Sequence, residues 1–234
     1  MSIRENIDGV LKRIDSTCKK TGRNPKDITV IAVSKTVDSE RAKEAVEAGI
    51  MNLGENRVQE LVKKHEELDG INVKWHMIGH LQKNKVKYII DKTVLIHSVE
   101  SLELAEEINK RAIKNDLTAN VLIELNIGEE DSKFGINEES VYDFVTNINK
   151  FENLRVLGLM TVAPFCENPE DVRWVFKKMK NIFDKVSTMD LKNVQMKYLS
   201  MGMTNDFEIA IEEGSNIIRI GTAIFGARKY KEEE

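Results

Sequence analysis

Cysteine and proline are scarce in this sequence of 234 residues, and both shortages limit what the protein can be. Its two cysteines, Cys18 and Cys166, lie far apart, without a CxxC spacing or a neighbouring histidine. Ordinary reduced thiols are therefore expected, and neither a disulfide framework nor a zinc site is indicated. With three prolines and no Gly/Ser/Pro-rich stretch, the chain shows no candidate linker. We expect a single domain over residues 1–234.

Long apolar runs and an excess of charge of one sign are also missing. No stretch approaches the ~18 apolar residues of a membrane-spanning helix, and the N-terminus carries acidic residues where a signal peptide has an apolar core. The 35 Lys and Arg residues are interspersed with 39 Asp and Glu residues, giving a net charge of −4. This distribution argues against a nucleic-acid or membrane-surface binder. We expect a cytoplasmic protein.

The chain does contain eight short apolar runs that alternate with amphipathic helical stretches. Parallel strands need a helical crossover, and closing the sheet removes its edges, so eight such units predict a single (β/α)8 TIM barrel of the α/β class. An open doubly wound sheet is the alternative. An extra helix from residue 3 to about residue 20 precedes the first strand. The predicted strands are residues 28–34, 51–53, 73–78, 94–98, 120–126, 154–160, 195–200 and 217–220.

Capping residues predict where several of the helices begin and end. Ser39 can cap the helix that stops at Gly49. Asn168 and Pro169 supply an N-cap and a first-turn proline for another helix. Gly214 ends the helix that follows the seventh strand.

Lys35 directly follows the first apolar run, at the end of a barrel where the chemistry of this fold is found. It shares a strand face with Thr29, Ile31 and Val33. If that face lines the barrel, desolvation and neighbouring cations lower the pKa of the ammonium group and expose the lone pair that attacks an aldehyde. Lys35 is thus a candidate Schiff-base lysine. The alternative is a lysine that extends into solvent from the strand end.

Two loops near the C-terminus have the composition of a phosphate site. The loops after the seventh and eighth strands form the usual phosphate seat of such barrels, and here they read Ser200-Met201-Gly202 and Gly221-Thr222. Glycine lets the backbone approach a phosphate, and the two hydroxyl groups can donate to its oxygens. Turn formation alone explains each loop singly, but it explains the pair less well.

Arg219 lies within the last apolar run, where an unpaired guanidinium would be costly to bury. One candidate acceptor is the pyridine nitrogen of pyridoxal 5'-phosphate. A donor at that position discourages protonation of the nitrogen and weakens the ring as an electron sink. A structural ion pair with a nearby Glu or Asp is the alternative.

Five motifs, in this order, resemble those of the pyridoxal phosphate homeostasis proteins, which are similar to the barrel domain of alanine racemase standing alone. The resemblance spans nearly the whole chain. The motifs are AVSKT at 32–36, GENRVQE at 54–60, HMIGHLQKNK at 76–85, LSMGM at 199–203 and RIGTAIFG at 219–226.

The resemblance implies a pyridoxal 5'-phosphate cofactor, with Lys35 as the covalent aldimine lysine and Arg219 at the pyridine nitrogen. The phosphate ligands that it implies are Ser200, Gly221 and Thr222. The pocket-lining residues that it implies are Asn56, His80 and Met201. Where relatives often read Ser-Lys-Ser-Gly, this chain has Ser132-Lys133-Phe134-Gly135, which leaves the loop after the fifth strand in question.

Two classes of function are compatible with this resemblance. Alanine racemases use a second base, a tyrosine from a separate β-domain, whereas residues 227–234 end this chain straight after the predicted barrel. Tyr230 in the charged tail is a poor substitute. We therefore expect a monomeric binding protein without assigned catalytic residues, which stores, buffers or delivers pyridoxal phosphate to apo-enzymes. The alternative is a weak pyridoxal-phosphate-dependent amino-acid racemase.

Two other groups of residues carry weaker signals. His76 and His80 are four apart, but Gly79 would break a helix that placed them on one face, and even with His97 nearby no metal site is predicted. The basic residues at 83, 85 and 87 are read as a solvated face because so short a run in an acidic protein is a weak nucleic-acid signal.

Overall fold

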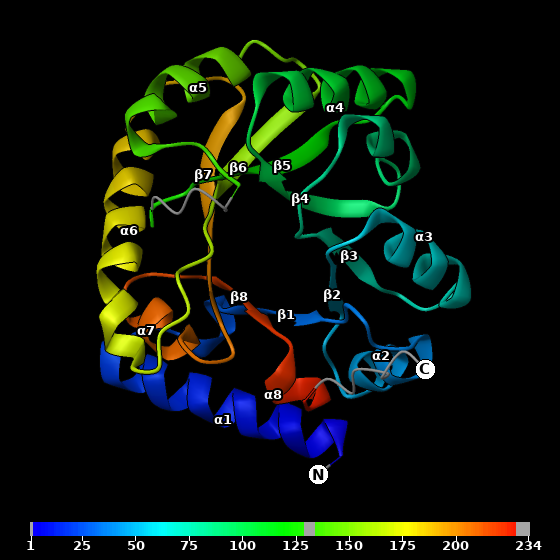
Figure 1. The fold of residues 1–234 in the computed structure, drawn as a ribbon, viewed down its shortest axis with the longest axis vertical. Coiled ribbons are helices and arrows are strands. Elements are labelled where there is room, and N and C mark those ends of the chain that lie inside the picture. Colours follow the sequence, from blue (N-terminus) through cyan, green and yellow to red (C-terminus); the bar gives the residue numbers. More distant parts are fainter. Residues whose placement is uncertain (1, 129–133, 228–234) are drawn as a thin grey trace, which may run out of the picture.

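A computed structural model describes residues 2–128 and 134–227 of the chain. Its eight strands form one closed barrel in which each neighbouring pair is parallel, including β8 beside β1 (Figure 1). The predicted barrel is confirmed and the open-sheet alternative is wrong. The strands are β1 (Thr29–Val33), β2 (Asn52–Glu55), β3 (Lys74–Met77), β4 (Thr93–Val99), β5 (Ala119–Glu124), β6 (Leu154–Met160), β7 (Val194–Met203) and β8 (Ile217–Ile220).

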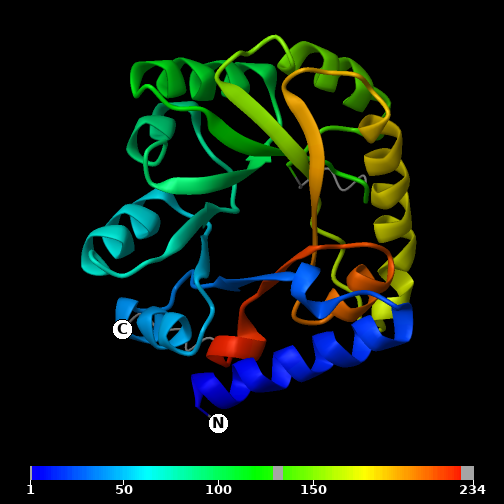
Figure 2. The ribbon, with the colours of Figure 1, turned by 180° about the vertical axis from the view of Figure 1, so that it is seen from behind.

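Helices surround the barrel and cover the outer face of its strands (Figures 1 and 2). The α-helices are α1 (Ile3–Thr21), α2 (Ser39–Glu47), α3 (Val58–Glu67), α4 (Leu102–Lys114), α5 (Val141–Ile148), α6 (Arg173–Ser187), α7 (Phe207–Glu212) and α8 (Thr222–Phe225). Short 3-10 helices occupy Pro25–Asp27, Lys83–Tyr88, Glu138–Ser140 and Pro169–Val172. The crossover from β3 to β4 uses the second of these, with no α-helix.

The extra N-terminal helix is present as α1. A capping box between Ser2 and Glu5 begins it, and Gly22, at φ 69°, ends it. Its buried residues recur at helical spacing and include Ile3, Ile7 and Val10. The helix packs against α7, α8 and α2 (Figure 2). It covers the side of the barrel where α8 is only four residues long.

Apolar side chains fill two separate cores, one on each face of the barrel wall. The larger core lies between the strands and the helices and includes Leu53, Met201 and Ile218. The smaller core fills the inside of the barrel. Its buried members are Ile31, Leu95, Leu122, Leu157, Met160 and Ile217. Because strand residues alternate between these two cores, a polar side chain in a strand faces either the helices or the barrel interior.

β7 and β2 continue two or more residues beyond their predicted ends, and this changes the place of two polar residues. β7 runs on to Met203, so Ser200 lies inside a strand and not in the loop after it. β2 runs on to Glu55. The extension of β7 includes Gly202 at φ 94°, where a Cβ atom would lie 2.6 Å from the side chain of Ala210. Only glycine allows α7 to approach the strand this closely.

The predicted helix signals are partly confirmed. Asp38, and not Ser39, is the N-cap of α2, because its side chain accepts a hydrogen bond from the Arg41 amide at 2.8 Å. Asn168 caps the segment that begins at Pro169, as predicted. The glycines that follow α2 and α7 both have positive φ angles.

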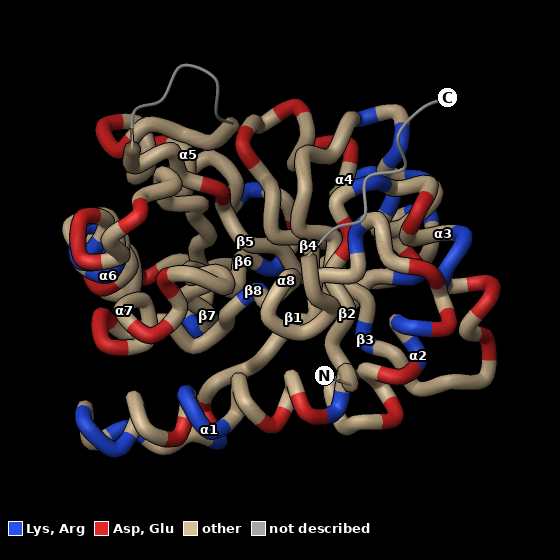
Figure 3. The backbone as a smooth tube through the Cα atoms, turned by 60° about the horizontal axis from the view of Figure 1, so that its bottom comes forward, with Lys and Arg blue, Asp and Glu red and all other residues tan. Residues whose placement is uncertain are grey.

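Charged residues of both signs are distributed over the outer helices. In Figure 3, Lys and Arg positions lie among Asp and Glu positions along α1 and α3. Within residues 2–128 and 134–227, no helix has the length and apolar character needed to cross a membrane.

Candidate functional site

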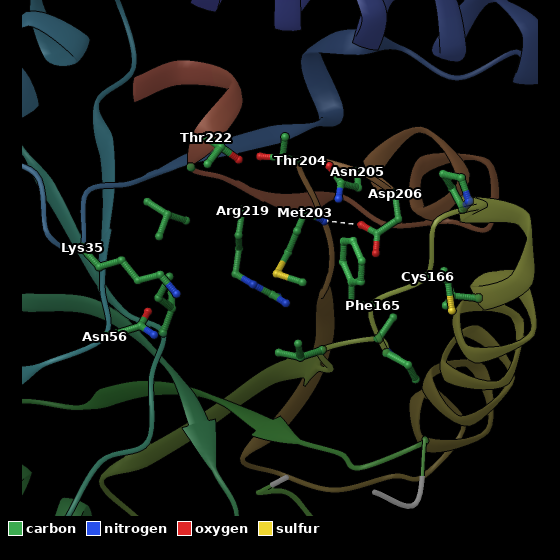
Figure 4. A pocket seen from close by; sticks show the side chains of 18 residues that line it. Lys35, Asn56, Phe165, Cys166, Met203, Thr204, Asn205, Asp206, Arg219 and Thr222 are labelled. Atoms are coloured by element: carbon green, nitrogen blue, oxygen red, sulfur yellow. Dashed lines mark hydrogen bonds between the residues drawn. The ribbon is translucent and has the colours of Figure 1, made fainter. Parts of the chain in front are cut away.

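A cavity of about 530 Å³ opens at the ends of the strands, where the sequence predicted the site. We call it the mouth cavity. In Figure 4, Lys35 and Asn56 lie on one side of it, Phe165 and Cys166 on the other, and Arg219 between them. The residues that line it are Val33, Lys35, Asn56, Ile78, Val162, Ala163, Pro164, Phe165, Cys166, Pro169, Val172, Met203, Thr204, Asn205, Asp206, Arg219, Gly221 and Thr222.

Lys35 enters the mouth cavity from the end of β1. Ile31 belongs to the core inside the barrel and Val33 lines the cavity, so the strand face predicted for Lys35 is confirmed. Lys35 is half-buried, and the next residue, Thr36, turns the chain with φ 64°. Few residues other than glycine adopt this conformation without support from their surroundings.

A buried ion pair on the other face of β1 holds the backbone beside Lys35 in place. Lys64 of α3 donates to Glu55 Oε1 at 2.6 Å and to the Ser34 carbonyl at 2.6 Å. The Ser34 hydroxyl donates to the same carboxylate oxygen, also at 2.6 Å. We call Ser34, Glu55 and Lys64 the α3 cluster. It fixes the two residues that flank Lys35, because Glu60, 3.7 Å from Lys64, also accepts from the Thr36 amide at 2.9 Å.

The α3 cluster buries a carboxylate, which is costly unless the charge is paired. Burial raises the pKa of Glu55, although Lys64 and the Ser34 hydroxyl both oppose that increase. The second carboxylate oxygen, Oε2, is buried without a hydrogen-bond partner among the residues described. The buried negative charge of Glu55 is therefore balanced mainly by Lys64.

Arg219 lies at the base of the mouth cavity, with 5 % of its surface exposed. Nη1 donates to the Ser200 carbonyl at 2.9 Å and to the Ser200 hydroxyl at 2.7 Å, and Nη2 donates to the Thr161 carbonyl at 2.7 Å. These acceptors are neutral. Burial lowers the pKa of Arg219 to about 10, against the opposing effect of Glu124 and Asp206. At neutral pH the side chain is a buried cation.

Four further side chains continue from Arg219 across the inside of the barrel. Ser200 Oγ lies 3.1 Å from His97 Nδ1, His97 Nε2 lies 3.0 Å from His76 Nδ1, and His76 Nε2 lies 3.2 Å from Asn52 Oδ1. We call this series, Arg219–Ser200–His97–His76–Asn52, the lumen chain. It connects β8 and β7 with β4, β3 and β2. The step from β7 to β4 joins opposite walls of the barrel, since these strands are not neighbours.

Hydroxyl and backbone groups border the mouth cavity beside β7 and β8. Gly221 and Thr222 line it, as predicted, and Thr204 lines it where the sequence suggested Ser200. The Thr204 hydroxyl accepts from the Ala223 amide at 3.5 Å, which joins the two loops. Thr204 is the first residue after β7. A prediction that placed the end of this strand at Met203 would have pointed to Thr204.

Three residues that the resemblance placed at the site lie elsewhere. Ser200 is fully buried below the mouth cavity and bonded within the lumen chain, because β7 is longer than predicted. Met201 points outwards into the larger core, since it alternates with Ser200. His80 pairs with Glu100 at 2.8 Å and stacks on Phe134 with ring centroids 3.9 Å apart, outside the mouth cavity. Ser132, Lys133 and Tyr230 lie outside the described residues.

The histidines do not gather into a metal site in the part of the chain that the structure describes. His76 and His97 contact each other, whereas His80 faces Glu100. No three His, Cys, Asp or Glu residues of residues 2–128 and 134–227 form a group that could hold a metal ion.

Comparison with known proteins identifies the relatives of this chain. Residues 11–229 match the family model of the alanine racemase N-terminal domain. A protein of Aquifex aeolicus named pyridoxal phosphate homeostasis protein is 46 % identical over 230 residues, which cover 98 % of this chain and 100 % of the relative. A Haemophilus influenzae protein of the same name is 37 % identical over 232 residues, covering 98 % of each chain.

A solved structure extends the comparison to a bound cofactor. PipY of Synechococcus elongatus, solved with pyridoxal phosphate bound, is 27 % identical to this chain and superimposes with a TM-score of 0.84. The match covers 96 % of this chain and 100 % of PipY.

Proposed function

Because this chain belongs to the pyridoxal phosphate homeostasis proteins, a family built on the alanine racemase N-terminal domain, we propose that it binds pyridoxal 5'-phosphate in the mouth cavity and serves in intracellular homeostasis of that cofactor. The observation that carries the proposal is that a lysine, a buried arginine and a hydroxyl-bearing border line the same cavity. These three features suit the aldehyde, the ring nitrogen and the phosphate of one ligand.

Lys35 would hold the cofactor covalently. Its amine could condense with the aldehyde of the cofactor, with the aldehyde oxygen lost as water, so that Nζ would hold the cofactor. Arg219 lines the same cavity as Lys35. The α3 cluster holds the backbone before Lys35, and Glu60 holds the backbone after it.

Arg219 would face the pyridine nitrogen. Three of its five N–H groups are bonded to Ser200 and Thr161, which leaves two without a partner among the described residues. A cation that remains protonated at neutral pH donates to the ring nitrogen and keeps that nitrogen unprotonated. The bound ring is then a weak electron sink, which suits storage of the cofactor better than turnover of amino acids.

The phosphate would lie at the border formed by Gly221, Thr222 and Thr204. Thr204 replaces Ser200 in this role, because the Ser200 hydroxyl is already bonded and has no exposed surface. Asn56 would line the ring side of the cavity, where Gly79 lets the β3 loop approach it. A Cβ atom at Gly79 would lie 2.5 Å from the Asn56 carbonyl oxygen.

The covalent role of Lys35 is tested by trapping. We expect the purified protein with pyridoxal phosphate to absorb visible light, and borohydride to fix the cofactor to the peptide that contains Lys35. Lys35→Ala should abolish both signals, whereas Lys197→Ala, which removes a lysine elsewhere in the chain, should leave them intact. Trapping on Lys35→Ala protein at the wild-type level would overturn the assignment.

Delivery of the cofactor to other proteins is tested separately. We propose a cytoplasmic monomer that hands pyridoxal phosphate to apo-enzymes. Holo-protein mixed with an apo-enzyme that requires the cofactor should activate it faster than the same concentration of free cofactor does. Equal rates would favour storage without delivery, and light scattering of the protein would test the monomer.

A further inference from the structure

The middle of the lumen chain is buried, so its polar atoms need hydrogen-bond partners within the protein. Ser200 and His97 have no exposed surface, and His76 is 4 % exposed. Burial lowers the pKa of His76 to about 4 and that of His97 well below its ordinary value, with Arg219 adding to the effect on His97. Both imidazoles are therefore neutral at physiological pH. A neutral imidazole has one donor nitrogen and one acceptor nitrogen.

The donor at one end of the lumen chain and the acceptor at the other end fix which atom donates in each hydrogen bond between them. Arg219 can only donate, so the Ser200 hydroxyl accepts from Nη1. The described residues offer the hydroxyl proton no acceptor besides His97 Nδ1, at 3.1 Å. His97 must then carry its own proton on Nε2.

The same reasoning continues to the other wall of the barrel. His97 Nε2 donates to His76 Nδ1, which leaves the His76 proton on Nε2. There it meets Asn52 Oδ1, which can only accept. The donor at one end and the acceptor at the other end are thus compatible with a single arrangement, in which both histidines are Nε2–H tautomers.

We propose that Ser200, His97 and His76 are positioning residues, which hold Arg219 in the orientation that directs its two remaining N–H groups into the mouth cavity. The part of this inference that concerns the cofactor rests on the proposed function; the arrangement of protons does not. The chain anchors a buried guanidinium without a carboxylate partner. A carboxylate bonded to Nη1 would neutralise much of the positive charge that faces the ring nitrogen.

The tautomers can be measured in the cofactor-free wild-type protein. Long-range ¹H–¹⁵N correlation spectra of protein labelled on histidine nitrogen should show His76 and His97 as neutral Nε2–H tautomers at pH 7. An Nδ1–H tautomer or a protonated ring at either residue would overturn the proposed arrangement. Since this readout needs neither a variant nor the cofactor, it stays informative if the proposed function is wrong.

The positioning role is tested by cofactor affinity. His97→Leu removes the acceptor for Ser200, and we expect the dissociation constant for pyridoxal phosphate to rise about tenfold. His97→Asn, whose amide oxygen can replace Nδ1, should recover part of this loss. Leu122→Val, a change in the apolar core inside the barrel, is the matched control and should leave the affinity within about twofold.

The outcomes separate the two proposals. No binding by wild-type protein contradicts the proposed function and leaves the tautomer result to decide the proton arrangement. Wild-type binding with an unchanged affinity in His97→Leu contradicts the positioning role alone. Equal losses in His97→Leu and Leu122→Val would also contradict it, because general loosening of the barrel would then explain the effect.

Discussion

The α3 cluster and the lumen chain both hold a buried cation next to the mouth cavity, and they do so by opposite means. Lys64 is paired with the carboxylate of Glu55 on the outer face of the barrel wall. Arg219, on the inner face, donates to a hydroxyl and two carbonyl groups. The first cation is hydrogen-bonded to a carboxylate, whereas the second is hydrogen-bonded only to neutral groups and feels the carboxylates of Glu124 and Asp206 through space.

This difference follows from what each cation has to do. Lys64 is structural, and both of its short bonds serve to fix Glu55 and the Ser34 backbone. Under the proposed function, Arg219 needs its charge and two of its donors for the cavity. A fully bonded ion pair would leave neither available, whereas neutral acceptors restrain the side chain without cancelling its charge. Each substitution below tests one side of this comparison.

The largest effect is expected from breaking the ion pair of the α3 cluster. Lys64→Met leaves Glu55 buried without its cation, and we expect the free energy of unfolding to fall by about 3 kcal/mol. Glu55 should then take up a proton, so the loss should be larger at pH 8 than at pH 5. Urea denaturation at both pH values measures this.

The control for that experiment is the adjacent lysine. Lys63 is exposed, at 73 % of its side chain, and lies 3.7 Å from Glu67. Lys63→Met should change the stability by less than about 0.5 kcal/mol. Similar losses in the two variants would show that Lys64 is not an essential partner of Glu55.

Breaking the lumen chain at its first member should be the next largest effect. Ser200→Ala deprives Arg219 of one acceptor and leaves the neutral Nδ1 of His97 without a donor. We expect a loss of about 2 kcal/mol, because two buried polar groups lose a partner at once. Thermal unfolding of the cofactor-free protein measures it, and a loss below that of Ser34→Ala would contradict the importance given to the lumen chain.

The pH dependence of stability tests the neutral histidines of the lumen chain. His76 has a folded-state pKa of about 4, below its ordinary value, so the unfolded chain binds a proton first as the pH falls. Stability from this group is therefore present above about pH 6.5 and is lost between pH 6.5 and 4. His76→Gln should reduce the loss between pH 7 and 5 by about 2 kcal/mol.

Glu124, a carboxyl group that acts on Arg219, should change the stability with pH in the opposite direction. Burial raises the pKa of Glu124 to about 7, with Glu100 adding to the increase and Arg219 opposing it. The folded protein thus binds this proton first, and stability from it grows as the pH falls from 7 towards 4.5. Glu124→Gln should therefore increase the stability that is lost as the pH falls, whereas His76→Gln should reduce that loss. Denaturation curves that move in the same direction for both variants would contradict these assignments.

The smallest effect is expected at the serine of the α3 cluster. Ser34→Ala removes a donor to Glu55 Oε1, but Lys64 still donates to the same oxygen. We expect a loss of about 1 kcal/mol, measured by urea denaturation. A loss equal to that of Lys64→Met would mean that the hydroxyl, and not the ammonium group, compensates the carboxylate.

Much of the fold and part of the site follow from the sequence. The alternation of eight apolar runs with helical stretches predicted the barrel. It also placed Lys35 on one strand face with Ile31 and Val33, because side-chain direction in a strand alternates with residue number, but only the structure shows that this face lines the barrel. Gly221 and Thr222 reach the mouth cavity for the same local reason, since they directly follow β8.

Only the tertiary structure decided which polar residues meet. Thr204 lines the mouth cavity and Ser200 does not, because β7 continues for three residues beyond its predicted end by pairing with its neighbours, and no local signal marks that strand end. His97 and Ser200 are 103 residues apart in the chain and come into contact across the closed barrel. The sequence by itself determined that Lys35 directly follows the first predicted strand and that Arg219 lies within the last. The closure of the sheet and its register determined what holds them there, because hydrogen bonds across the interior depend on distances between strands that are far apart in the chain.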